Sequence, residues 1–382
     1  MLPFSNLTGD LALDIYAEGL AEDLIDRMAR LRWLPIIARS SSFAFRGLDV
    51  DARAAGKELG ARYVFEGRVK PIGGGISLAA SLSDSETGQL IWSNRINLPK
   101  EHQSDALNQL ITGLAATLGV KIEQQEQSLV LSKPQSDLNV RDLIWRGRWY
   151  LNNLSRKSAA KARQCFEEAL AREPGSSEAI IQLAIARFYE LWTGRGSAEE
   201  IKELRQMAQR AIIADLEDAR GHMIAGIAEM WLRQPLRAEA LLARAIELNP
   251  SQFLAYGQMG SLLYLRGEPK KALNVLETAM RLSPNDFNLF YVHGEMAMAH
   301  LMVGQYEQAV SCADLAIMTR QSYWYAHVVK INALKRFGDR AGAEQASHEL
   351  NVTVPQFDPA HTDWLPFVDP AWNEYLRDGL NF

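Results

Sequence analysis

A period of 34 residues is the feature of this sequence that most restricts how it can fold. Pro250 and Pro284 lie one period apart, and each is preceded by two alanines at matching distances. These alanines are Ala238 and Ala245 in one copy and Ala272 and Ala279 in the next, and the register also fits Ala162, Phe166, Ala169 and Pro174. Such a period indicates stacked helix pairs, because one pair cannot bury both of its faces alone.

These positions resemble the tetratricopeptide repeat, in which small residues let two antiparallel helices approach closely and proline ends the second helix. Gly226, Gly260 and Gly294 occupy the small position of the first helix. Leu216 and Gln321 stand where a proline would be expected, so those copies are degraded. The register predicts about six repeats in residues 139–357, at 141–176, 177–218, 219–252, 253–286, 287–323 and 324–357.

Residues 1–123 have a different pattern, in which strand-like and helix-like segments alternate. Helices are expected at 19–31, from Asp49 or Asp51 to Gly60, and at 104–119. Strands are expected at the first residues, at 34–38, and in two or three segments between 62 and 98. We interpret Gly73 to Gly75 as a hairpin turn, since a phosphate loop would need a helix start behind it. The prediction is a βαβαββα-like α+β domain, joined by a linker at 124–138 to the all-α repeat superhelix.

Several segments of this first domain resemble the amino-terminal TolB-like (FlgO-like) domain of bacterial signalling proteins. They are "LPFSNLTGD", "YAEGLAEDLIDRMARL", "IIARSSSFAFRG", "AAGKELGARYVFEGRV" and "LSDSETGQLIW". In that family tetratricopeptide repeats follow, and "VDPAWNEYLRDGL" fits the usual end of the region. The resemblance implies an effector in front of the shared region, either a class III adenylate or guanylate cyclase or a winged-helix domain like that of CadC-type and HilA-type regulators. It also implies that "MLPFSN" begins inside a longer polypeptide.

The composition excludes several functions for this chain. A net charge of -5 and a pI near 5.9 argue against direct nucleic-acid binding, which needs clustered Lys and Arg. No apolar stretch is long enough for a membrane span. Cys165 and Cys312 provide no disulfide framework and favour a reducing compartment. We therefore predict a cytoplasmic chain, with the periplasmic side of a membrane-anchored parent as the alternative.

The sequence carries no recognisable catalytic motif, and the chain as given is expected to be no enzyme and to hold no cofactor or metal. His293 and His300 are seven residues apart, a spacing that favours packing over metal ligation on a helix. Residues 358–382, with Trp364, Phe367 and Trp372, are expected to cap the last repeat.

The favoured function is a non-catalytic sensory and protein-interaction region that regulates an amino-terminal effector. The alternatives are the regulatory half of a cyclase and a free-standing tetratricopeptide adaptor, and a homodimer is possible in each case. The repeat family lines its concave groove with the first helix of each pair, which implies a protein or peptide partner there. Carried onto this register, the groove residues are Arg220, Met223, Tyr264, Asn288, Tyr291, Glu295, Met298, Tyr325, Asn332 and Lys335.

Overall fold

The structure is a computed structural model that describes residues 1–6, 8–48, 50–73, 75–99, 105–152, 155–283, 286 and 288–381. It divides into an N-terminal unit, Met1–Ser132, and a C-terminal unit, Lys133–Phe382. Three residues used in the sequence argument, Asp49, Gly74 and Pro284, lie outside the described ranges.

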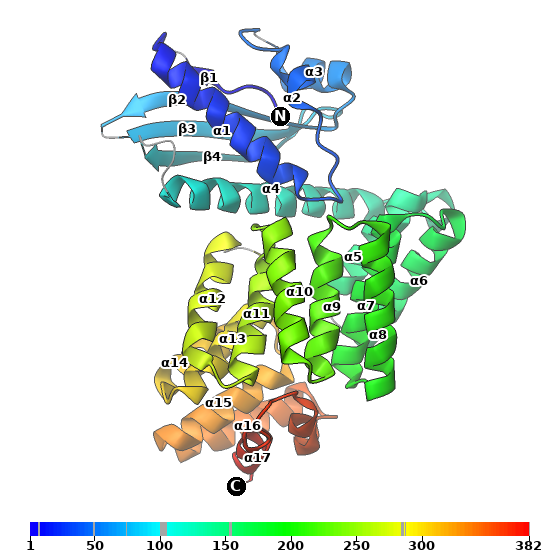
Figure 1. The fold of residues 1–382 in the computed structure, drawn as a ribbon, viewed down its shortest axis with the longest axis vertical. Coiled ribbons are helices and arrows are strands. Elements are labelled where there is room, and N and C mark those ends of the chain that lie inside the picture. Colours follow the sequence, from blue (N-terminus) through cyan, green and yellow to red (C-terminus); the bar gives the residue numbers. More distant parts are fainter. Residues whose placement is uncertain are drawn as a thin grey trace. The chain divides into compact units, whose positions relative to one another are not determined.

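The N-terminal unit contains a four-stranded sheet in the order β1-β2-β3-β4. Its strands are β1 (Ser5–Asn6), β2 (Tyr63–Ile72), β3 (Gly75–Asp84) and β4 (Leu90–Pro99). β1 runs parallel to β2, whereas the other neighbours are antiparallel (Figure 1). Leu2 extends the first pairing, since its backbone N–H donates to the Phe65 carbonyl over 2.9 Å.

Four helices accompany this sheet: α1 (Leu11–Ala29), α2 (Arg39–Phe43), α3 (Ala52–Leu59) and α4 (Asp105–Leu131). Alternate residues of β2 point to opposite faces. Phe65 joins a core with α1 and α4, while Val64 packs with Ala55 of α3 on the other face. The helix predicted to end at Gly60 is confirmed as α3, in which Asp51 caps the start and Gly60 adopts a left-handed conformation.

Three sequence expectations about this unit need correction. Residues 34–38 form no strand, because only Leu34 of this segment is buried and Pro35 has no N–H to donate to a sheet. The helix expected from residue 19 begins at Leu11, where Asp10 caps it. The expected linker is helical as far as Leu131, since α4 continues past residue 124 and buries Val130.

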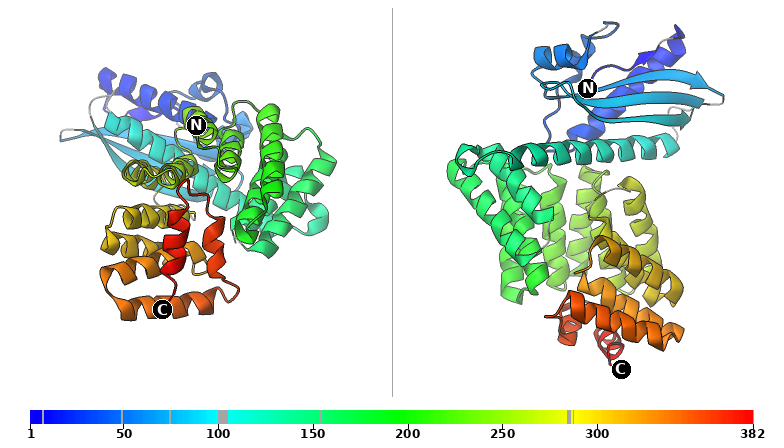
Figure 2. Two further views of the ribbon diagram at one scale, coloured as in Figure 1. Left: turned by 60° about the horizontal axis from the view of Figure 1, so that its bottom comes forward. Right: turned by 180° about the vertical axis from the view of Figure 1, so that it is seen from behind.

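The C-terminal unit is built from helix pairs, one in each of the six predicted segments (Figure 2). The first helices are α5 (Val140–Asn152), α7 (Ser177–Gly194), α9 (Ala219–Trp231), α11 (Phe253–Leu265), α13 (Leu289–Met302) and α15 (Trp324–Phe337). The second helices are α6 (Arg156–Arg172), α8 (Ala198–Ala214), α10 (Pro235–Leu248), α12 (Pro269–Leu282), α14 (Tyr306–Thr319) and α16 (Arg340–Thr353). None of the helices in the described ranges has the length and apolar character needed to cross a membrane.

The small residues of the repeats act as expected, with one difference. A Cβ at Gly226 would lie 2.8 Å from Leu242, and one at Gly260 would lie 2.5 Å from Leu276, so both glycines admit the second helix of their own repeat. At Gly294 the space is taken instead by the Tyr323 ring, 2.4 Å from such a Cβ. The fifth repeat therefore uses its glycine to admit an aromatic side chain that precedes α15.

Residues 358–381, here called the C-terminal segment, contain a 3₁₀ helix, η2 (Pro359–Trp364), and α17 (Ala371–Asp378). Trp364 donates its indole N–H to the Gly196 carbonyl over 2.9 Å, and Val368 N–H donates to the Leu265 carbonyl over the same distance. Farther along, Asn332 donates to the Leu376 carbonyl over 3.0 Å. Arg233 of the third repeat also donates to the Phe367 carbonyl. The expectation of a cap on the last repeat is thus too narrow, because the segment contacts the second, third, fourth and sixth repeats.

Candidate binding site on the first helices

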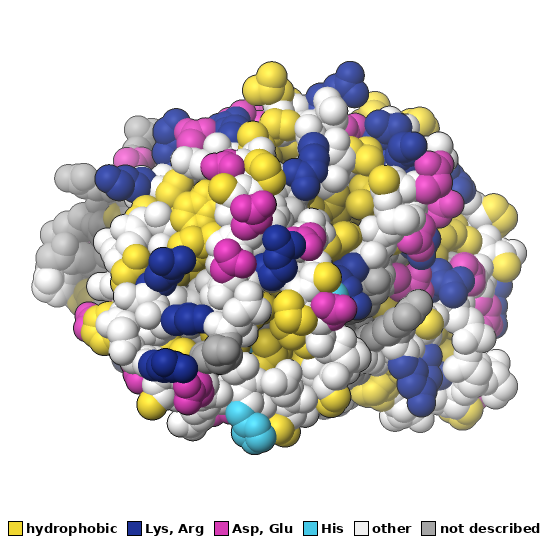
Figure 3. Space-filling view, turned by 90° about the horizontal axis from the view of Figure 1, so that it is seen from below, with side chains coloured by type: hydrophobic (Ala, Val, Ile, Leu, Met, Phe, Trp, Pro, Cys, Tyr) yellow, Lys and Arg dark blue, Asp and Glu magenta, His cyan; other side chains and the backbone are white. Residues whose placement is uncertain are grey.

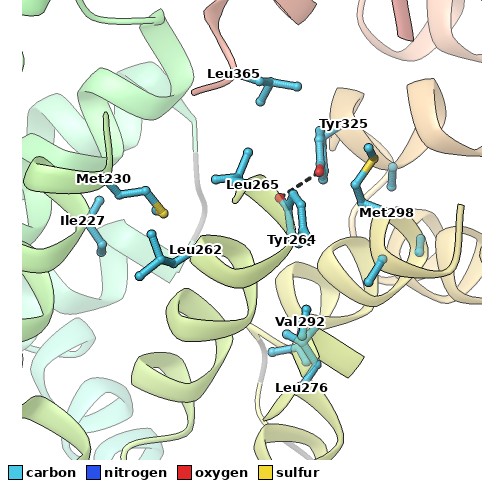
Figure 4. Close-up of a cluster of buried hydrophobic side chains, with 14 of the residues drawn as sticks. Ile227, Met230, Leu262, Tyr264, Leu265, Leu276, Val292, Met298, Tyr325 and Leu365 are labelled. Carbon is cyan, nitrogen blue, oxygen red and sulfur yellow. Dashed lines mark hydrogen bonds between the residues drawn. The ribbon is translucent and has the colours of Figure 1, made fainter. Parts of the chain in front are cut away.

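A small hollow, partly open to solvent, lies where five first helices and the C-terminal segment meet. All of its lining residues except Leu365 belong to first helices of the repeats, and Figure 4 labels several of them. They are Phe188 and Trp192 of α7, Ile227, Met230 and Trp231 of α9, Gln258, Ser261, Tyr264 and Leu265 of α11, Tyr291 and Glu295 of α13, Tyr325 of α15, and Leu365. Most are apolar or aromatic, and Glu295 is the one carboxylate among them.

Glu295 is the centre of a network of hydroxyl groups. Ser261 and Tyr264 each donate to its Oε2 over 2.6 Å, and Tyr323 donates to Oε1 over 3.4 Å. Two more tyrosines extend the network: the Tyr291 hydroxyl lies 2.6 Å from that of Ser261, and Tyr325 lies 2.8 Å from Tyr264. When Glu295 is ionised and accepts the protons of Ser261 and Tyr264, Tyr291 and Tyr325 can donate to those two hydroxyls. Ser261 also lies 3.1 Å from the Gly257 carbonyl, a second acceptor for its single proton.

This environment changes the acid–base behaviour of the cluster. Burial raises the pKa of Glu295 to about 7, although the hydrogen bonds from Ser261, Tyr264 and Tyr323 act to lower it. Burial also raises the pKa of Tyr264, Tyr291, Tyr323 and Tyr325, and the nearby Glu295 charge adds to this effect. Near neutral pH the carboxyl group of Glu295 is therefore the member of the cluster that exchanges a proton.

This pKa predicts a pH dependence of stability. A carboxyl group with a raised folded-state pKa stabilises the fold fully below its unfolded pKa, and this contribution is lost as the pH rises through the folded pKa. Between pH 4.5, the ordinary pKa of this group, and about pH 7, its pKa in the folded chain, the unfolding free energy should fall by about 3 kcal/mol. We expect Glu295→Gln to remove this decline. Urea unfolding at pH 5, 6, 7 and 8 checks it, and an unchanged decline in the variant would contradict the assignment.

The structure brings four of the ten predicted groove residues to the hollow: Tyr264, Tyr291, Glu295 and Tyr325. Met223 and Met298 lie in the hydrophobic core, and Asn288 is buried at the start of α13. Asn332 and Lys335 bind carbonyls of the C-terminal segment. These other positions are therefore occupied by contacts within the chain.

Arg220, the remaining predicted residue, belongs to a buried ion-pair network. Its guanidinium lies 2.7 Å from Asp218 and 2.5 Å from Glu178 of α7. Burial alone would raise the pKa of Glu178, but the charge and hydrogen bonds of Arg220 outweigh it and hold that pKa at about 2. The pair of Glu178 and Arg220 therefore links the second repeat to the third by a buried ion pair.

Sequence reasoning missed the aromatic side of the hollow, namely Phe188, Trp192 and Trp231. Trp192 and Trp231 lie in the last turns of their first helices, and neither is among the residues that the repeat register assigned to the groove. An aromatic residue repeated at the ends of consecutive first helices is the signal that could have identified them. Leu365 had no such signal, because only the fold of the C-terminal segment places it there.

The other candidate residues show no comparable arrangement. The part of the chain that the structure describes holds no group of three or more His, Cys, Asp or Glu side chains arranged to bind a metal ion. Burial raises the pKa of the Cys165 thiol to about 11, which keeps it protonated at neutral pH. The surface in Figure 3 carries basic and acidic side chains interspersed with hydrophobic ones.

Comparison with known proteins gives one similar curated protein and a set of similar folds, and no family model matches the chain. A protein of Rhizobium meliloti (strain 1021) named putative adenylate cyclase 3 is 30% identical over 242 residues. The match covers 63% of this chain and 41% of that protein, so the chain spans less than half the length of the curated relative.

Two solved structures show the fold. The human IFIT1 dimer with m7Gppp-AAAA has a TM-score of 0.53 at 13% identity, covering 68% of this chain and 62% of that one. The Cut9–Hcn1 heterotetramer of APC/C has a TM-score of 0.50 at 17% identity, covering 68% and 48%. These likenesses confirm the predicted fold class, a small sheet-containing unit followed by a tetratricopeptide-like superhelix.

Proposed function

We propose that this chain is a non-catalytic regulatory region that binds a protein or peptide partner and controls an adenylate cyclase effector. The observation that carries the proposal is the hollow, toward which the first helices of five consecutive repeats direct aromatic and hydroxyl side chains. Concave sites with an apolar wall and a few convergent polar groups are typical of ligand recognition.

The cyclase effector is supported by the name of the Rhizobium relative, which favours it over the winged-helix effector that the sequence resemblance also implied. Within this proposal the N-terminal unit is a TolB-like domain that transmits the binding state of the repeats. The proposed compartment is the cytoplasm, where the substrate ATP is available.

Two measurements test this function. The purified 382-residue chain should convert no ATP to cyclic AMP, because its role is regulatory. In the source organism, in-frame removal of the coding sequence for residues 133–382 should change cellular cyclic AMP severalfold. A strain with Glu247→Gln, a change at a side chain that is 70% exposed, is the matched control and should behave as wild type.

Either of two results would contradict the proposal. Cyclic AMP formation by the purified chain would show that the chain is itself an enzyme. Unchanged cellular cyclic AMP after the deletion would separate the chain from cyclase control and favour the free-standing adaptor.

A further inference from the structure

Glu295 differs from the other strongly buried carboxylates of the C-terminal unit in what surrounds it. Asp218 pairs with Arg220, Asp142 pairs with Lys133, and Glu229 lies 3.8 Å from Arg205. The groups that bind Glu295 are the hydroxyls of Ser261, Tyr264 and Tyr323, none of which carries a positive charge. A buried carboxylate is costly unless a cation compensates it. Packing alone does not explain why this position carries Glu.

The two oxygens of Glu295 are also unequally satisfied. Oε2 accepts two hydrogen bonds of 2.6 Å, whereas Oε1 accepts one long bond of 3.4 Å from Tyr323. A carboxylate oxygen has room for two donors. Oε1 therefore retains capacity for a stronger, charged donor.

The hollow is small, with room for a group of about the size of an ammonium ion, and it is partly open to solvent, where a stem could leave it. Rings of Phe188, Trp192, Trp231, Tyr291 and Tyr325 line it, and aromatic faces attract cations within about 6 Å of the ring centre. Met230, Leu265 and Leu365 supply apolar contacts for a stem (Figure 4).

We propose that the hollow recognises a primary ammonium group on an apolar stem, with Glu295 as its counter-ion, and that the proposed partner presents this group as a lysine side chain. The inference rests on the proposed function and names the partner chemistry of the same site. A lysine side chain fits because its ammonium is a compact charge with three donors at the end of a four-carbon stem.

The partner is taken as a peptide because the chain already holds a peptide segment beside the hollow. The C-terminal segment passes there, and its backbone carbonyls accept hydrogen bonds from Arg233 and Asn332 of the repeats. Its residue at the hollow is Leu365, which brings no charge to Glu295. An incoming lysine would supply that charge.

Binding should be linked to a proton. The titratable groups that face Glu295 are Tyr264 of α11, Tyr291 of α13, Tyr323, and Tyr325 of α15, all with raised pKa values that keep them neutral. α7, α9 and the C-terminal segment present only non-titratable side chains to the hollow: Phe188, Trp192, Ile227, Met230, Trp231 and Leu365. An ammonium group prefers the ionised carboxylate, so its binding should release a proton at pH below about 7.

The test titrates the full chain with n-butylammonium and with the peptide acetyl-Ala-Ala-Lys-Ala-Ala-amide, using calorimetry and tryptophan fluorescence. Butanol and the peptide with an acetylated lysine are the uncharged counterparts. Glu295→Gln should weaken binding of both cations by roughly tenfold or more, since it removes one partner of a buried charge pair. Glu229→Gln, at a buried carboxylate of α9 that lies outside the hollow, is the matched control and should bind as wild type.

The outcomes distinguish a lysine peptide from a free ammonium compound as the ligand, and they distinguish failure of this inference from failure of the proposed function. Binding of the lysine peptide, lost on acetylation and in Glu295→Gln, supports the proposal, and binding of butylammonium alone overturns its assignment to a peptide. Equal binding of butanol, or equal affinity of Glu295→Gln and wild type, would overturn the ammonium site itself. If neither cation binds while deletion of residues 133–382 still changes cyclic AMP, this inference fails and the proposed function stands.

Discussion

Replacing Arg220 by methionine is expected to lower the unfolding free energy of the C-terminal unit by about 3–5 kcal/mol at pH 7. The substitution leaves Asp218 buried and Glu178 largely buried, with their main cation gone. Removing one partner of a buried ion pair costs this much because the remaining charges keep their desolvation penalty. Urea unfolding followed by tryptophan fluorescence measures the loss.

The control is Arg244→Met in the same repeat. Arg244 pairs with Glu247 over 2.9 Å, but its side chain is 41% exposed, so its loss should cost less than about 1 kcal/mol.

The pH dependence of the unfolding free energy adds a second check on the role of Arg220. The lowered pKa of Glu178, about 2 against 4.5, means that its paired contribution is present above pH 4.5 and is lost as the pH falls toward 2. Equal losses in the two variants at pH 7 would refute the ion-pair assignment.

Phe367→Ala is expected to release the C-terminal segment while leaving the repeats folded. The Phe367 side chain is fully buried, 6.1 Å from the Tyr264 ring and 6.4 Å from Trp372 between ring centres. Removing a buried phenylalanine costs about 3–5 kcal/mol, and this cost falls on the docking of the segment. Amide exchange should become fast in residues 365–378 and remain slow in α9 to α15.

Val368→Ala is the control, because Val368 is 56% exposed and keeps its backbone bond to Leu265. Its amide exchange should match that of the wild type.

Arg233→Gly tests the docking of the C-terminal segment from the side of the repeats. Arg233 adopts a left-handed conformation, φ 56°, one period before Gly267, and its side chain donates to the Phe367 carbonyl. Continued protection of residues 365–378 in Phe367→Ala would show that other contacts suffice to hold the segment.

The sequence by itself determined the local elements of the repeats. The alanine and glycine period required close helix pairs, and the structure places Ala245 and Ala279 fully buried at those interfaces. The cap pair Asp51 and Gly60 likewise set both ends of α3. Such features depend on neighbours within a few residues or one period, so the chain order records them directly.

The tertiary structure alone decided the content of the groove. Of the residues that the family register assigned to the groove, Tyr264, Tyr291, Glu295 and Tyr325 line the hollow. The register also listed Arg220 and Asn332, but the structure places Arg220 in a buried ion-pair network and Asn332 in a hydrogen bond to the C-terminal segment. The register missed Trp231 and Leu365, which come together from positions more than one hundred residues apart. Burial and hydrogen bonding depend on which distant segments meet. A repeat period fixes the direction of a side chain, whereas the path of the C-terminal segment across the repeats decides what that side chain touches.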